Sequence, residues 1–100
     1  MRVITGLAKG RRLEELPGLD TRPTTSRVKE GLFSAIQFDI EGRRVLDLFA
    51  GTGQLGIEAL SRGACFCDFV DSAPAALNIV RRNVRTCGFE DRCACHGKDF

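Results

Sequence analysis

The sequence predicts an α/β domain with a parallel β-sheet, preceded by a short hairpin and a helix. Three observations predict this class. From residue 43 onward, apolar β-forming runs alternate with helical segments in the order βαβαβ. A glycine-rich turn joins the first of these strands to the first helix. The composition, with 43% hydrophobic and 28% charged residues, is that of an ordinary globular protein. Parallel strands with right-handed crossovers make this half of a doubly wound sheet.

Residues 1–42 are predicted to form an N-terminal extension of the sheet domain. Residues 2–13 (RVITGLAKGRRL) have the pattern of a hairpin with a glycine-marked turn. A helix is predicted over residues 24–38, where apolar residues recur at helical spacing. Its buried stripe is expected to contain Val28, Leu32, Phe33 and Ile36. Arg27 and Lys29 are expected to point away from that stripe.

Residues 43–100 are predicted to supply three strands and two helices. The strands are the runs RRVLDLFA, ACFCDFV and DRCACHG. The first helix follows the glycine turn and is stopped by Gly63. The second helix has Ser72 as its predicted N-cap, Pro74 in its first turn and Gly88 at its end. Its buried stripe is expected to be Leu77, Val80 and Val84, with Arg81, Arg82 and Arg85 on the outside.

Charge is distributed unevenly along the chain, although the net charge is only +2. Residues 1–29 hold seven Lys or Arg against three acids, whereas residues 45–100 are nearly neutral. A basic N-terminal region suggests an anionic partner for that region. No apolar run is long enough to span a bilayer and no signal peptide is visible, so a cytoplasmic protein without membrane contact is expected.

The five cysteines form two C-x-C pairs and a singleton. An odd count without a secretion signal argues against a disulfide framework. Both pairs lie in strand-like apolar runs, whereas structural zinc usually uses wider spacing in loops. We therefore interpret them as reduced, small, buried hydrophobic residues and predict no metal site.

The turn Gly51-Thr52-Gly53-Gln54-Leu55-Gly56 is a G-x-G-x-x-G between a strand and a helix. Such glycines allow a tight turn, close approach of a ligand to the backbone, and close packing of helix on strand. Asp71 lies 20 residues beyond Gly51 at the end of the second strand, where an acid can accept hydrogen bonds from both hydroxyls of a ribose. The pattern predicts a nucleoside-containing ligand. The alternative is a turn that is only structural, with Asp71 solvated at its strand end.

Asp47, four residues before Gly51, favours one kind of nucleoside ligand. A pyrophosphate bound at this turn would be repelled by a fixed carboxylate nearby. S-adenosylmethionine carries an ammonium and a sulfonium at its methionine end, where a carboxylate is favourable. The pattern therefore favours the methyl donor over NAD or FAD. The alternative is a strand residue whose carboxylate only binds neighbouring backbone.

With these motifs in place, the chain resembles the N-terminal part of the RsmD family of bacterial 16S ribosomal RNA guanine-N2 methyltransferases. The resemblance covers nearly the whole chain. Its distinctive stretches are TRPT at residues 21–24 and LDLFAGTG followed by GIEALSRGA within residues 46–64. Residues 2–6, residues 9–13 and the run RVKEGLF at residues 27–33 match as well.

The resemblance implies a partial Rossmann-like class I S-adenosylmethionine-dependent methyltransferase fold with an N-terminal RNA-binding extension, residues 1–42. Residues 43–100 would be the first half of the methyltransferase domain. The turn would hold the methionine end of the donor, Asp71 its ribose and Asp99 its adenine amino group. An exposed terminal position is the alternative for Asp99, and the family usually has Glu at the position of Asp71. The predicted donor-binding set is Asp47, Phe49, Ala50, Gly51, Thr52, Gly53, Asp71, Ser72 and Asp99.

The family's catalytic tetrapeptide, Asn/Asp-Pro-Pro-Phe/Tyr, does not occur, because the three prolines are not adjacent. In the family this segment grips the exocyclic amine of the base, so no catalytic residue is assigned here. We interpret the sequence as a truncated product that is inactive alone, with its first strand left as an exposed edge. The alternatives are a non-catalytic nucleotide- or donor-binding fragment and an NAD-dependent oxidoreductase domain.

The basic N-terminal region is the predicted contact with ribosomal RNA or the small ribosomal subunit. A surface without Tyr or Trp is expected to read RNA shape and phosphates rather than stack on bases. A solvated face without a partner is the alternative. The expected protein is a monomer. The predicted RNA-binding residues are Arg2, Lys9, Arg11, Arg12, Arg22 and Arg27.

Overall fold

The computed structural model describes residues 1–15, 24–48 and 50–98, without the side chains of 24–26. Its sheet contains the parallel strands β1 (Arg44–Leu48), β2 (Phe66–Asp71) and β3 (Cys93–Gly97) in that spatial order. Asp47 of β1 lies beside Phe69 of β2, which lies beside Cys95 of β3. The predicted βαβαβ order and parallel sheet are confirmed.

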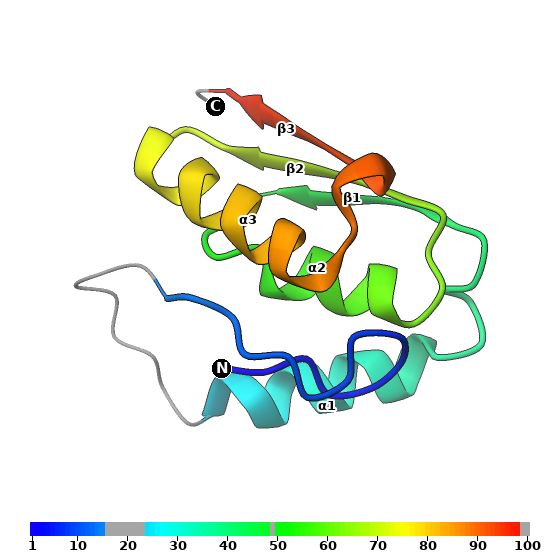
Figure 1. Cartoon of the computed structure of the whole chain (residues 1–100). Coiled ribbons are helices and arrows are strands. Elements are labelled where there is room, and N and C mark those ends of the chain that lie inside the picture. Colours follow the sequence, from blue (N-terminus) through cyan, green and yellow to red (C-terminus); the bar gives the residue numbers. More distant parts are fainter. Residues whose placement is uncertain (16–23, 49, 99–100) are drawn as a thin grey trace.

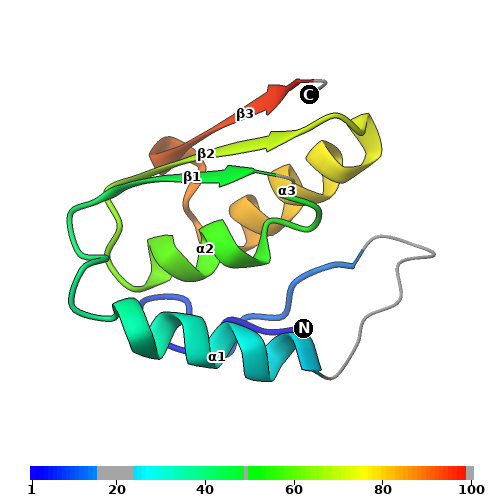
Figure 2. The same cartoon turned by 180° about the vertical axis from the view of Figure 1, so that it is seen from behind.

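The helices form layers on one side of the sheet. Helices α2 (Gln54–Ser61) and α3 (Pro74–Cys87) cover the same face, while α1 (Thr24–Ile36) lies further out (Figure 1). The N-terminal hairpin lies beside α1, on the side nearer α3, as the reverse view also shows (Figure 2). A short 3-10 helix, Glu90–Arg92, leads into β3. No described helix is both long and apolar enough to cross a lipid bilayer.

One hydrophobic core joins the N-terminal segment to the sheet layer. Phe69, Ile57 and Leu60 have no exposed side-chain surface, and Val3 and Leu13 of the hairpin pack into the same cluster. Gly56 of α2 faces β2 so closely that an added Cβ would lie 2.4 Å from the Phe69 ring. The predicted close packing at the third glycine of the turn is therefore present.

The predicted orientation of α1 is wrong. Lys29 is buried, with 2% of its surface exposed, whereas Val28 is 68% exposed. Of the predicted apolar stripe only Phe33 is fully buried. The reason is electrostatic: a buried carboxylate on α2, that of Glu58, lies 3.2 Å from the Lys29 ammonium and holds this face of α1 inward. The helical periodicity of α1 gives no information about this partner on another helix.

The start of α3 differs from prediction in one detail. Ala73, in extended conformation, occupies the N-cap position and Pro74 is the first helical residue, so the predicted N-cap at Ser72 is wrong. The carboxylate of Asp71 accepts the Ala73 amide hydrogen at 2.9 Å, and the N-cap residue Ala73 makes no side-chain capping hydrogen bond. The buried stripe of Leu77, Val80 and Val84 and the end at Gly88 are confirmed.

The sheet face opposite the helices is open among the described residues. Leu46 and Leu48 of β1 are 61% and 48% exposed, and β1 has β2 as its only described strand partner. This agrees with the expectation of an exposed apolar first strand. Arg44, Asp68 and His96 form a polar cluster on this open face: Asp68 accepts a hydrogen bond of 3.0 Å from Arg44, and His96 Nε2 lies 3.0 Å from Asp68 Oδ1.

Candidate functional site

The turn after β1 is shaped by two glycines in the left-handed region. Gly51 has φ 60° and Gly53 has φ 80°, values that residues with a Cβ rarely adopt. The Gly53 amide donates to the Ala50 carbonyl at 2.8 Å, which closes the turn. The Gly53 carbonyl then accepts the first helical hydrogen bond of α2, from Ile57 at 2.9 Å. The chain reverses within these residues at the carboxyl end of β1, where Gly51 is half-buried and Ala50, Thr52 and Gly53 are buried.

Asp47 is a buried carboxylate directly beneath this turn. It is 8% exposed, and its Oδ2 accepts a hydrogen bond of 3.1 Å from the Gly56 amide. Burial raises its pKa from 3.8 to about 6; the Gly56 hydrogen bond opposes this, and the charge of Asp71 adds to it. No described Lys or Arg forms an ion pair with it. A cation placed beside Asp47 would stabilise its ionised form.

Asp71 at the end of β2 supplies the second carboxylate of the site. Its Oδ2 accepts a hydrogen bond of 3.0 Å from the Gly51 amide, and its Oδ1 accepts one of 2.9 Å from Ala73. The carboxylate is thereby fixed against the turn while remaining partly exposed. Each carboxylate oxygen has a further lone pair that can accept a hydroxyl donor. Two negative groups on neighbouring strands suit a ligand with a cation and hydroxyls better than one with a pyrophosphate.

Most of the residues predicted to bind the donor come together at this edge of the sheet. The structure places Asp47, Ala50, Gly51, Thr52, Gly53 and Asp71 around one turn, with exposed Ser72 next to Asp71. Phe49 and Asp99 lie outside the described residues.

Asn83 on α3 supports the turn and was missed by sequence reasoning. It is fully buried, and its Nδ2 donates to the Thr52 carbonyl at 2.9 Å and to the Glu14 carbonyl at 3.0 Å. Its Oδ1 accepts from the Glu14 amide at 2.6 Å. The residue therefore binds the end of the hairpin segment to the glycine turn. One feature of the sequence could have identified Asn83: it is an amide residue within the otherwise apolar stripe of α3 that contains Val80 and Val84.

Glu58 on α2 is the second residue missed. It has no exposed surface; its Oε1 accepts from the Ile4 amide and its Oε2 from the Thr5 amide, at 2.9 and 3.1 Å. Lys29 and Arg62 form ion pairs with it at 3.2 and 2.9 Å. Burial raises its pKa, but the Ile4 hydrogen bond, Arg62 and Lys29 together outweigh burial, so the pKa lies below the ordinary value. Glu58 thus anchors the hairpin and α1 to the helix that starts at the turn.

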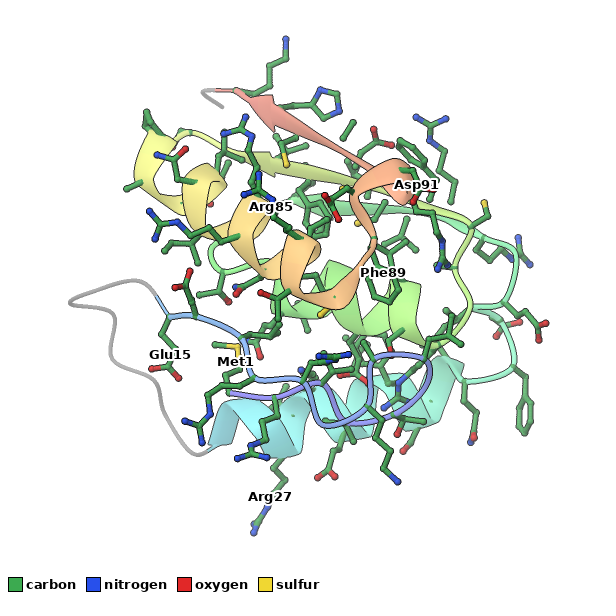
Figure 3. The ribbon with its side chains drawn as sticks, viewed as in Figure 1. Met1, Glu15, Arg27, Arg85, Phe89 and Asp91 are labelled. Atoms are coloured by element: carbon green, nitrogen blue, oxygen red, sulfur yellow. The ribbon has the colours of Figure 1, made fainter. Side chains whose placement is uncertain are left out.

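The predicted RNA-binding residues that the structure describes lie at the surface, whereas Lys29 is buried. Arg27 projects from α1 away from the body of the molecule (Figure 3). Arg22 lies outside the described residues. The basic residues of the hairpin, all with exposed side chains, are Arg2, Lys9, Arg11 and Arg12. Arg2 and Arg12 are paired by an antiparallel bridge, so one short hairpin presents four positive charges.

Comparison with known proteins places this arrangement among methyltransferases. The family model described as "Conserved hypothetical protein 95" matches residues 1–100. "Putative rRNA methyltransferase YlbH" of Bacillus subtilis is 54% identical over 86 residues, which cover 86% of this chain and 47% of that protein. "Ribosomal RNA small subunit methyltransferase D" of Haemophilus influenzae is 42% identical over 86 residues, covering 86% and 45%.

The same similarity extends to solved structures. The structure titled "Putative methyltransferase yhhF from Escherichia coli" matches with a TM-score of 0.88 and 35% identity. The match covers 99% of this chain and 53% of that chain. The chain therefore spans about half the length of the proteins it resembles.

Proposed function

We infer the function of this chain from its family: it belongs to the family described as "Conserved hypothetical protein 95", the RsmD family. We propose that the chain is the donor-binding part of an RNA methyltransferase. Its fold is a partial class I methyltransferase fold. The proposed reaction is methylation of the exocyclic N2 of a guanine in 16S rRNA with S-adenosylmethionine. The observation that carries the proposal is the buried carboxylate of Asp47, which lies behind the glycine turn and has no cationic partner among the described residues.

The residues at the turn fit the donor in charge and in hydrogen-bonding capacity. When bound, S-adenosylmethionine supplies an activated methyl group on a sulfonium. Asp47 would attract the ammonium of its methionine end, and the backbone of Ala50, Gly51, Thr52 and Gly53 would line that end. Asp71, fixed by the Gly51 amide, would accept the ribose hydroxyls, with Ser72 beside it. Phe49 and Asp99 complete the proposed donor-binding set.

The N-terminal region, residues 1–42, is the proposed contact with rRNA or the small ribosomal subunit. Exposed arginines and lysine on the hairpin can neutralise phosphates without reading sequence. The proposed residues are Arg2, Lys9, Arg11, Arg12, Arg22 and Arg27. We expect the protein to act as a monomer in the cytoplasm.

The chemical step of methyl transfer requires alignment of the acceptor amine with the donor methyl group. The residues of this chain hold the donor and the RNA; none is assigned to the amine, because the family's Pro-Pro tetrapeptide is absent from the sequence. We therefore propose that residues 1–100 alone bind the donor without turnover.

Calorimetric titration with S-adenosylhomocysteine and with NAD tests the proposal. We expect binding of the former and none of the latter, because a pyrophosphate would lie against Asp47. Binding of NAD alone would overturn the assignment in favour of a dinucleotide-dependent oxidoreductase. The Asp39→Asn variant, which removes an exposed carboxylate elsewhere, is the control for an Asp47→Asn variant that should lose affinity. Methyl incorporation into small-subunit RNA tests turnover, and we expect none for this chain alone.

A further inference from the structure

The outer face of α3 carries two arginines that the donor-binding site does not use. Arg81 and Arg85 are four residues apart, so they lie on the same side of the helix. Both are exposed. Among the described residues, the only polar contact of Arg81 is with the Asn78 side chain at 3.4 Å, and Arg85 has none. Their neighbour Arg82 differs, because it forms an ion pair with Glu14 at 3.6 Å.

Arg81 and Arg85 border a hollow between α3 and β3. Its volume is about 380 Å³, and it opens at the surface. The other lining residues are Val84, Glu90, Cys93, Ala94 and Cys95. Burial raises the pKa of Cys93 to about 11, so this thiol is uncharged at neutral pH. The hollow thus has a largely uncharged floor, two guanidinium groups on its helix side and one carboxylate, Glu90.

The hollow lies on the same side of the molecule as the basic hairpin. Glu14, at the end of the hairpin segment, contacts both Arg82 and Asn83 of α3. The positive charge of Arg11 is close enough to α3 to act on the thiol of Cys87. Figures 1 and 2 agree that the hairpin and α3 occupy this side, and Figure 3 shows Arg85 there. The positive charges of Arg11 and Arg85 therefore lie on one side of the molecule, with the Glu14–Arg82 ion pair beside them.

We propose that the hollow between α3 and β3 binds the sugar–phosphate backbone of the RNA, with Arg81 and Arg85 as phosphate ligands. This inference rests on the proposed function, since it extends the contact of the same RNA. Guanidinium groups without an acidic partner are well suited to phosphates, and the uncharged floor can receive a ribose or base. The negative charge of Glu90 repels phosphates, so the phosphates bind on the α3 side of the hollow. An acidic peptide is the competing occupant, but continuity with the hairpin charges favours RNA.

Binding of a labelled single-stranded oligouridylate at several salt concentrations tests the proposal. Removing one arginine that neutralises a phosphate should reduce the slope of log K against log salt by about 0.7. We expect a reduction of this size for Arg85→Gln and about twice this reduction for the double variant Arg81→Gln/Arg85→Gln. Both variants should also lose affinity for the oligouridylate several-fold. The matched control is Arg43→Gln, which removes an exposed charge before β1. Circular dichroism verifies that each variant is folded.

The outcomes separate this inference from the proposed function. If Arg11→Gln reduces the slope but Arg85→Gln behaves as Arg43→Gln does, the α3 site is overturned and the RNA-binding function stands. If the unaltered chain binds no oligouridylate and no rRNA, the proposed RNA partner itself is wrong. If polyglutamate binds and loses affinity in Arg85→Gln while RNA binding is unchanged, the hollow is a peptide site and the inference is also overturned.

Discussion

The side chain of Asn83 joins the Thr52 carbonyl, within the glycine turn, to the backbone of Glu14, which lies far earlier in the sequence. All three hydrogen bonds of this carboxamide go to main-chain groups, and the side chain is fully buried. The loop proposed to receive the donor and the segment proposed to contact RNA therefore have a common support on α3.

Replacing Asn83 with leucine should destabilise the chain by about 2–4 kcal/mol, because the buried Thr52 carbonyl and two part-buried main-chain groups of Glu14 would lose their hydrogen-bond partner. It should also lower the affinity for S-adenosylhomocysteine, since the Thr52 carbonyl is no longer held. Urea unfolding and calorimetry measure the two effects. Asn78→Leu, on the exposed face of the same helix, should change stability by less than about 0.5 kcal/mol. Equal effects of the two variants would contradict the structural role of Asn83.

Asp47→Asn should increase stability at neutral pH while it weakens donor binding. The pKa of Asp47 is about 6 in the folded chain and 3.8 ordinarily, so the folded state binds more protons between these values. Stability contributed by this residue therefore falls as pH rises from about 4 to 6, by about 3 kcal/mol in all. The stability of the Asp47→Asn variant should not fall over this pH range. The free energy of unfolding of both proteins, measured across the same pH range, checks this.

Donor affinity should have the opposite pH dependence, because only the ionised form of Asp47 attracts the ammonium. We expect the affinity of the unaltered chain for S-adenosylhomocysteine to rise as pH passes about 6, and the affinity of Asp47→Asn to stay low and flat. Titration calorimetry at several pH values, with Asp39→Asn as control, measures this. If the unaltered chain, Asp47→Asn and Asp39→Asn have the same affinity, Asp47 does not take part in donor binding.

Glu58→Gln should cost about 3–5 kcal/mol of stability at neutral pH, because the Lys29 ammonium would be left buried without its negative partner. Glu30→Gln, on the exposed side of α1, is the matched control. The pKa of Glu58 lies below 4.5, so its contribution is complete above that pH and is lost as pH falls through the folded-state value. Adding Lys29→Met to Glu58→Gln should restore part of the lost stability.

Gly56→Ala should destabilise the chain by about 1–3 kcal/mol despite the better helix propensity of alanine. The new methyl carbon would lie 2.4 Å from a ring carbon of Phe69 and 2.6 Å from the sulfur of Cys67. Gly31→Ala, in α1, meets no atom within 4 Å and should stabilise the chain by about 0.5–1 kcal/mol. Thermal unfolding distinguishes the two, and a stabilised Gly56→Ala would contradict the close packing of α2 on β2.

Local sequence patterns predicted the sheet and the turn because their causes are local. Alternating apolar runs, the glycines at 51 and 53, and an acid at the end of β2 each depend on neighbours in the sequence. The stripe of α3 was predicted for the same reason, since one face of that helix packs on the sheet.

The residues that sequence reasoning misjudged are those whose partners lie far along the chain. Lys29 is buried because Glu58, 29 residues later, neutralises it, and no periodicity contains that information. The burial of the Asn83 side chain is explained by its hydrogen bonds to the main chain of Glu14 and Thr52. Helix α3 begins at Pro74 with Ala73 as its N-cap, one residue later than capping by Ser72 predicts, and the Asp71 carboxylate binds the Ala73 amide just before the helix.

The anchoring of the hairpin by Glu58 and Asn83 has a thermodynamic consequence. Both residues belong to helices that pack directly behind the loop proposed for the donor, so the hairpin cannot shift without disturbing that loop. Occupancy of one surface should then change the affinity of the other, and by the same factor in both directions. The affinity for the proposed RNA partner should therefore differ between the free chain and the chain with the proposed methyl donor bound.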